Sequence, residues 1–264
     1  MSQILAGKTA LILGVANRWS IAYAIAQAFT REGAELILTY QSDRQKQTVE
    51  ELADGLKVRQ VISCDVSEDD QITTLTNELK GSGAVLNAVV HSIAFANRED
   101  LSRPFVETSR EGFKLAHDVS AYSLVAVARA TAPLMAAKDQ GGGSLMTLSF
   151  LGSQRVVQNY NVMGVAKAAL ESTVRYLAND LGPANIRVNA ISAGAVKTTS
   201  ARGIRDFSKM LDGVAAISPL RRITEPAEVA DTAVFLASDL GRGVTGNILY
   251  VDAGFQIMGL AIQA

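Results

Sequence analysis

Short apolar segments alternate with helical segments along most of this chain, and this alternation restricts the fold more than any other feature. Segments so short and so apolar are typical of parallel strands that are buried on both faces. Helical spacing of apolar residues lies between most of them, which predicts an α/β domain with a doubly wound, mostly parallel sheet and helices on both faces. The predicted strands are Thr9–Leu13, Glu35–Tyr40, Val58–Ser63, Val85–Val90, Ser144–Leu148, Ile186–Ile191 and Ile248–Val251.

The first two strands and the helix between them form a βαβ unit of roughly thirty residues. The start of such a helix carries free N–H groups and the positive end of the helix dipole, next to the carboxyl end of the first strand. In sheets of this kind, ligands bind beyond the carboxyl ends of the strands. Those ends are Gly14, Gln41, Asp65, His91–Ala94, Ser149–Phe150 and Ser192–Gly194.

Two of the remaining helices carry specific expectations. Ser67 is a predicted N-cap for a helix over Glu68–Lys80, whose first turn is acidic. A longer helical region runs from about Ser109 to Lys138, with a predicted break near Val119–Ser120.

Composition sets limits on the kind of protein. The 264 residues are 48% hydrophobic, enough for one large core, so we expect a single domain over residues 1–264. A net charge of −1 argues against nucleic-acid binding. The sequence contains no run of eighteen apolar residues, so no membrane-spanning helix is predicted. Cys64 is the only cysteine, so no internal disulfide can form and we expect no metal site. Without a secretory signal pattern at Met1–Lys8, we expect a cytoplasmic protein.

Tyr160 and Lys167 are the strongest candidates for chemistry. They are seven residues apart in a helical segment, almost two turns, which predicts one shared helix face with the two side chains about 10 Å apart along the axis. An ammonium near a phenol favours the ionised phenol and would make it a better partner for a developing oxyanion. Taken alone, such a pair is far more often a packing tyrosine and a solvated lysine.

Several motifs in order carry a resemblance that no one of them carries alone. Gly14 is the only glycine of the common dinucleotide fingerprint, so that signal is weak by itself. Yet the chain reads G-V-A-N-R-W-S-I-A at 14–22, C-D-V at 64–66, H-S-I-A-F-A at 91–96, N-Y-N-V-M-G-V-A-K at 159–167 and R-V-N-A-I-S-A-G at 187–194. Together these motifs resemble the NADH-dependent enoyl-acyl carrier protein reductases, a divergent branch of the short-chain dehydrogenase/reductase superfamily. The resemblance extends from Leu5 to about Phe255.

The resemblance implies a fold and a reaction. The fold would be a single Rossmann-like domain, and the reaction would reduce the 2,3 double bond of trans-2-enoyl-acyl carrier protein thioesters with NADH, in fatty-acid chain elongation. Most short-chain dehydrogenases have Tyr-x3-Lys, whereas this chain has the Tyr-x6-Lys spacing of the enoyl reductases. A 3-ketoacyl thioester or other carbonyl reductase, or a cofactor-binding regulator without turnover, remain alternatives. The Tyr-x6-Lys spacing argues against the first, and retention of both Tyr160 and Lys167 argues against the second.

The resemblance also implies residue roles. Tyr160 would hydrogen-bond the substrate's thioester oxygen and Lys167 the nicotinamide ribose, as the catalytic pair. The other implied cofactor contacts are Gly14, Ser20 and Ile21 at the pyrophosphate and ribose, Gln41 at the adenosine ribose, Asp65 and Val66 at the adenine, Ser92 and Ile93 along the cleft, and Val196 and Thr198 at the nicotinamide amide and phosphates. Because neutral Gln41 follows the second strand and Asp43 adds negative charge, we expect NADH to be preferred over NADPH.

The segment at about 195–218 can form a short amphipathic helix, because its apolar residues Ile204, Phe207, Met210 and Leu211 recur at helical spacing. We interpret it as a substrate lid, as the resemblance also implies. The expected substrate contacts are Ala96, Phe150, Tyr160, Ile204 and Phe207, and the resemblance implies that Arg205 and Lys209 dock the acidic acyl carrier protein. Small residues at 126, 128, 130, 168 and 169 favour self-association, and the resemblance implies a homotetramer.

The sequence also departs from its relatives. Phe150 stands where many of them have a second tyrosine, so a hydroxyl is missing there. Ala94 replaces a common glycine, and Gln158 and Ala195 replace prolines, which removes a fixed φ at each position.

Overall fold

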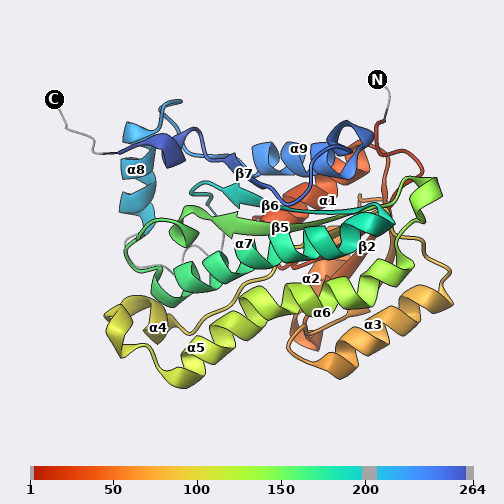
Figure 1. Cartoon of the computed structure of the whole chain (residues 1–264), viewed down its shortest axis with the longest axis horizontal. Helices are drawn as coiled ribbons and strands as arrows, with labels where there is room; N and C mark the ends of the chain where they lie inside the picture. The colour runs from red at the N-terminus through yellow and green to blue at the C-terminus, as the bar shows by residue number, and fades with distance from the viewer. Residues whose placement is uncertain (1–2, 198–206, 260–264) are drawn as a thin grey trace.

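A computed structural model describes residues 3–197 and 207–259, and of residues 207–209 the backbone alone (Figure 1). Its described strands form one seven-stranded sheet in the order β3-β2-β1-β4-β5-β6-β7, with every neighbouring pair parallel. The strands are β1 (Thr9–Leu13), β2 (Glu35–Tyr40), β3 (Val58–Ser63), β4 (Ala88–His91), β5 (Gly143–Phe150), β6 (Ile186–Ala193) and β7 (Ile248–Val251). The predicted α/β fold with a doubly wound parallel sheet is confirmed.

The helices form two layers around the sheet (Figure 1). Helices α1, α2 and α9 pack on one face, where Phe29 and Val49 are fully buried, and α3, α6 and α7 pack on the other. Each layer packs its apolar side chains against one face of the sheet, so the strands are buried on both faces, as expected for parallel strands. The helices are α1 (Ile21–Arg31), α2 (Asp43–Ala53), α3 (Asp69–Gly81), α4 (Arg98–Ser102), α5 (Arg110–His117), α6 (Ser123–Thr131), α7 (Asn161–Leu181), α8 (Phe207–Ile217) and α9 (Pro226–Ala237).

The strand order reverses beside β1, which pairs with β2 on one side and β4 on the other. In doubly wound sheets this crossover point opens a crevice at the carboxyl ends of the two central strands. Here those ends are Leu13 and His91, which are paired in register, followed by Gly14 and Ser92. The fold therefore brings the two motifs together at one edge of the sheet.

Several predicted element boundaries were wrong. Strand β5 begins one residue before and ends two residues after the predicted Ser144–Leu148, and β6 ends two residues after the predicted Ile186–Ile191. Helix α3 begins at Asp69 with Glu68 as its N-cap, because the Ser67 hydroxyl instead donates to Asp65 Oδ1 at 2.7 Å. Strand β4 begins only at Ala88, because Leu86 forms an isolated bridge with Met135.

The predicted break in the long helical region is present as a change of helix type. A π-helical turn, Asp118–Tyr122, separates α5 from α6. Among the described residues, no helix combines the length and the apolar character that a membrane crossing needs.

Candidate active site

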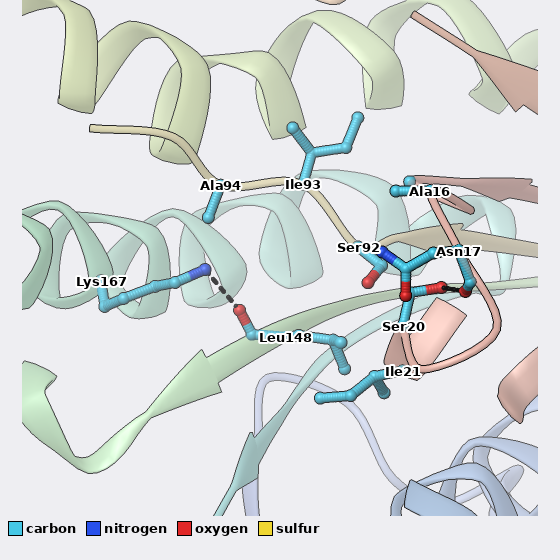
Figure 2. Close-up of a pocket in the computed structure, with 10 residues that line it drawn as sticks. Ala16, Asn17, Ser20, Ile21, Ser92, Ile93, Ala94, Leu148 and Lys167 are labelled. Atoms are coloured by element: carbon cyan, nitrogen blue, oxygen red, sulfur yellow. Dashed lines mark hydrogen bonds between the residues drawn. The ribbon is translucent and has the colours of Figure 1, made fainter. Parts of the chain in front are cut away.

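A cleft opens where the carboxyl ends of β1, β4 and β5 meet (Figure 2). It lies at the predicted crevice, and helix α7 supplies Lys167 from the far side. Its lining consists of Gly14, Ala16, Asn17, Ser20, Ile21, Ser92, Ile93, Ala94, Leu148 and Lys167. Lys167 and five other predicted cofactor residues are thus assembled in one cleft. Ala94, at the predicted strand end His91–Ala94, also lines it, and Ala16, Asn17 and Leu148 line it without having been predicted.

The turn from Gly14 to Ser20 shapes one wall of the cleft and starts helix α1. Ser20 is the N-cap of α1: its Oγ accepts a hydrogen bond from Tyr23 N at 3.2 Å and donates to the Asn17 carbonyl at 2.8 Å. The first turn of α1 contains no acidic residue. The positive end of the helix dipole therefore faces the cleft uncompensated, as an anionic pyrophosphate would require.

Gly14 lets the chain pass very close to β4. It has φ of +98°, and a Cβ at this position would lie only 2.1 Å from the carbonyl oxygen of Ser92. No residue with a side chain fits there unless the two strand ends move apart. The close backbone approach at Gly14 and the dipole at the start of α1 are both typical of dinucleotide-binding sites. These two features of the chain support a cofactor site in the cleft.

We expect Gly14→Ala to destabilise the protein by more than the about 1–3 kcal/mol that an unfavourable φ alone costs. The matched control is Gly55→Ala, which has φ of +84° but nothing within 4 Å of the added Cβ. Urea unfolding of both variants separates the cost of the clash with Ser92 from the cost of the dihedral angle. Equal losses in the two variants would contradict the close approach.

Gln41 and Asp65 meet at the carboxyl ends of β2 and β3. Gln41 Nε2 donates to Asp65 Oδ2 at 2.9 Å, while Asp65 Oδ1 accepts from Ser67 N and Oγ at 3.0 and 2.7 Å. Burial acts to raise the pKa of Asp65, but these hydrogen bonds outweigh it and hold the pKa below its usual value. An ionised carboxylate and a neutral amide are thus fixed side by side, with buried Val66 directly after Asp65.

Lys167 reaches the cleft from the second turn of α7 and is only 5% exposed. Its Nζ donates to the Leu148 carbonyl of β5 at 2.7 Å, as Figure 2 shows. Burial lowers the pKa of Lys167 to about 8, although the charge of Glu171 acts in the opposite direction. The ammonium is therefore present at neutral pH, and its remaining two protons can serve a ligand.

Tyr160 lies outside the first turn of its helix. It is the N-cap of α7, between Asn159 and Asn161, which both have positive φ. Helix α7 thus begins one residue after Tyr160, and the shared face of Tyr160 and Lys167 stays a prediction. Within the described lining of the cleft, Lys167 is included and Tyr160 is not.

The Tyr160 ring packs in a small apolar cluster with Ala96 and Leu101. It meets Phe150 edge to face, with ring centroids 4.9 Å apart. Burial raises the pKa of Tyr160 above its usual value, and Lys167 does not offset this. The expected effect of Lys167 in favour of the ionised phenol is therefore not found: the hydroxyl keeps its proton at neutral pH and can act as a hydrogen-bond donor.

His91, at the end of β4, is fully buried and neutral. Its Nδ1 is 3.1 Å from Thr147 Oγ1 and its Nε2 is 2.8 Å from Ser123 Oγ. Burial, with the charge of Lys167 adding to it, lowers the pKa of His91 to about 3. Both ring nitrogens are engaged inside the protein, so His91 supports the sheet edge under the cleft.

The remaining predicted site residues are distributed as follows. Val196 is buried just after β6, and Phe150 and Ala96 border Tyr160. Thr198, Ile204 and Arg205 lie outside the described residues, and the side chains of Phe207 and Lys209 in α8 are likewise not described. Sequence reasoning missed the Leu148 carbonyl and Glu171. The end of the predicted strand Ser144–Leu148 was the one available signal for the carbonyl.

The fold and the cleft define a dinucleotide-dependent oxidoreductase of the doubly wound α/β class. A family model described as "Enoyl-(Acyl carrier protein) reductase" matches residues 14–256. The enoyl-[acyl-carrier-protein] reductase [NADH] FabI of Bacillus cereus is 51% identical over 97% of this chain and all of its own, and that of Escherichia coli is 49% identical over 96% and 95%. The chain belongs to the enoyl-acyl carrier protein reductase family.

Solved structures agree with this assignment. The crystal structure of the Bacillus cereus reductase with NADP+ and indole naphthyridinone superposes with a TM-score of 0.94, covering 98% of this chain and 100% of that one. The Anaplasma phagocytophilum reductase in complex with NAD is 42% identical, with a TM-score of 0.92 over 98% and 96% of the two chains.

Proposed function

We propose that this protein reduces the 2,3 double bond of trans-2-enoyl-acyl carrier protein thioesters with NADH, in fatty-acid chain elongation. The observation that carries the proposal is the placement of buried Lys167 in a dinucleotide-type cleft, with protonated Tyr160 in the adjoining apolar cluster. The names of the Bacillus cereus and Escherichia coli relatives support the same reaction.

Bound NADH would supply a hydride to the β-carbon of the acyl chain. Tyr160 donates a hydrogen bond to the thioester oxygen, and this bond strengthens as negative charge develops on that oxygen in the transition state. Lys167 hydrogen-bonds the nicotinamide ribose and adds positive field beside it. Phe150 has no hydroxyl, so the proton that the α-carbon receives comes from another donor.

Comparison of two thioesters with the same carrier tests the reaction. With an enoyl thioester and NADH, we expect turnover, and with a 3-ketoacyl thioester we expect little. The reverse result would identify a carbonyl reductase, and NADH binding without turnover on either thioester would identify a regulator.

The other cofactor contacts follow the cleft. In this proposal, Gly14, Ser20 and Ile21 hold the pyrophosphate and its ribose at the start of α1, and Ser92 and Ile93 line the path to Lys167. Gln41 lies at the adenosine ribose, and Asp65 and Val66 at the adenine. Val196 and Thr198 complete the nicotinamide end, the latter outside the described residues.

NADH is expected to give a higher kcat/KM than NADPH. A 2′-phosphate would meet neutral Gln41 beside ionised Asp65, and neither offers it a cation. The Bacillus cereus relative was crystallised with NADP+, and the ratio of the kcat/KM values for the two cofactors tests the preference of this chain. Equal values would show that Arg44 reaches the phosphate.

A homotetramer is the proposed assembly. Support comes from large apolar side chains exposed on the outer helices: Phe113 is 40% exposed, Tyr122 43% and Val165 39%. Ala126 and Ala128 cannot take part as predicted, because both are buried in the protein's own core. Ala130, Ala168 and Ala169 are partly exposed and remain available. Light scattering at micromolar concentration measures the mass.

The proposed lid is the segment at about 195–218, with α8 as its helix. The described part of α8 packs Leu211 and Val214 against Ala195 and Phe255, which supports an inward apolar face. Ile204 and Phe207 would contact the acyl chain. Arg205 and Lys209 would dock the acidic carrier protein, and a cytoplasmic location fits such a partner.

Charge reversal at Arg205 and Lys209 is expected to raise KM for carrier-protein thioesters and to leave coenzyme A thioesters nearly unaffected. Rim charges act mainly on encounter rate, so the wild-type advantage should shrink as salt rises. Equal losses on the two substrates would indicate that the residues shape the lid instead.

A further inference from the structure

Glu171 is a buried carboxylate that the proposed reaction does not use. It lies on α7 one turn after Lys167 and is only 4% exposed. A carboxylate is costly to remove from water unless it is hydrogen-bonded or paired. The hydrogen bonds that Glu171 accepts therefore indicate its role.

Two serines donate to the same oxygen of Glu171. Ser149 Oγ lies 2.5 Å from Oε1, and Ser153 Oγ lies 2.6 Å from it. Ser149 belongs to β5, and Ser153 ends the short 3-10 helix Leu151–Ser153 that follows it. Glu171 thus fixes both ends of the segment Ser149–Ser153, which we call the β5 strap.

The β5 strap carries the wall against which Tyr160 packs. Phe150 meets the Tyr160 ring edge to face, and a Cβ on Gly152 would lie 2.4 Å from Tyr160 Cδ1. Leu148, the residue before the strap, accepts the Lys167 hydrogen bond. The carboxylate of Glu171 therefore holds the segment that contacts Tyr160 and that directly follows the hydrogen-bond acceptor of Lys167.

We infer that Glu171 is a positioning residue for the reductase site: its carboxylate holds the β5 strap against Tyr160, and it lies one turn of α7 from the Lys167 ammonium that would contact the cofactor. The inference rests on the proposed function. It names a role for Glu171 that neither the cleft lining nor the proposed cofactor contacts include.

Within the described residues, few other ionisable groups interact electrostatically with Glu171 and Lys167. His91, on β4, faces Lys167 and is neutral, since its pKa is about 3. Burial raises the pKa of Tyr250 of β7. The charges of Glu171 and Asp252 raise it further, and the charge of Arg155 lowers it. Glu171 is the carboxylate that favours the charged form of Lys167, against burial.

The expected result is a shift in the pH dependence of NADH binding. Lys167, with its pKa at about 8, loses its proton as pH rises through that value, so NADH affinity should fall there. Glu171→Gln keeps the shape and an acceptor oxygen but removes the charge, so this alkaline limb should move down by about one pH unit. The dissociation constant is measured by NADH fluorescence between pH 6 and 9.5 without acyl substrate, so the result does not depend on the proposed acyl substrate.

Two further variants separate charge from packing. In a Lys167→Arg background, where the cation stays protonated, adding Glu171→Gln should leave the pH dependence unchanged. Ser153→Ala removes one strap contact and no charge, so it should lower kcat with the enoyl thioester while leaving the alkaline limb in place.

If Glu171→Gln does not fold, Glu171→Asp gives the same test. The shorter side chain moves the carboxylate away from Lys167 by one methylene. The alkaline limb of NADH binding should therefore move down as in Glu171→Gln, but by a smaller amount. An unmoved limb in a folded Glu171 variant would overturn the electrostatic role. Wild-type kcat in Ser153→Ala would overturn the role of the strap.

Discussion

Replacement of Tyr160 by phenylalanine is expected to lower kcat about 10²- to 10³-fold, the usual loss when one donor to a developing oxyanion is removed. Burial holds the Tyr160 hydroxyl in its protonated form, so at neutral pH it can only donate to the thioester oxygen. The ring itself packs against Phe150 and Ala96, and phenylalanine keeps that packing. The folded structure and the NADH dissociation constant should therefore stay close to wild type.

A matched control is Tyr176→Phe on the same helix. Tyr176 is 74% exposed, so loss of its hydroxyl should leave the rate with an enoyl thioester unchanged. A wild-type rate in Tyr160→Phe would remove the assigned role. An equal loss of NADH affinity would place the hydroxyl at the cofactor instead of the substrate.

Lys167→Ala is expected to impair both cofactor binding and turnover. Hydrogen bonds to a charged group contribute about 1.5–3 kcal/mol, so the NADH dissociation constant should rise by about 10- to 150-fold. The same change leaves the buried carboxylate of Glu171 without its neighbouring cation, so the variant should also unfold at a lower temperature.

Titration of NADH into folded Lys167→Ala protein measures the affinity. Lys138→Ala, at an exposed position in a short 3-10 helix, is the control for loss of a lysine elsewhere. An unchanged NADH dissociation constant would contradict the assignment of Lys167 to the cofactor.

Strand positions were the most predictable part of the fold. Strands β1, β2, β3 and β7 match their predicted bounds, because short apolar runs between turn residues determine them locally. The beginning of β4 depends on a pairing with Met135 nearly fifty residues away, and periodicity carries no information on such a contact. The N-cap of α3 depends on competition between Asp65 and the helix for one serine hydroxyl.

The candidate site was predictable where it depends on strand ends. Gly14, Gln41 and Ser92 follow strands directly, Asp65 follows β3 after one residue, and parallel strands place their carboxyl ends at one edge. The start of α7 at Asn161, with Tyr160 as its N-cap, was not predictable, because periodicity carries no information on the positive φ of Asn159 and Asn161. Glu171 was missed because an acidic residue on a helix is ordinarily exposed. Only the packing of β5 against α7 brings Ser149 to it.

The most direct test of the proposed reaction follows deuterium from NADH labelled at C4 into crotonyl-acyl carrier protein. The proposed reaction predicts oxidation of NADH with formation of butyryl-acyl carrier protein that carries one deuterium at its β-carbon. Unchanged crotonyl thioester, together with rapid reduction of a 3-ketoacyl thioester in the same assay, would contradict it.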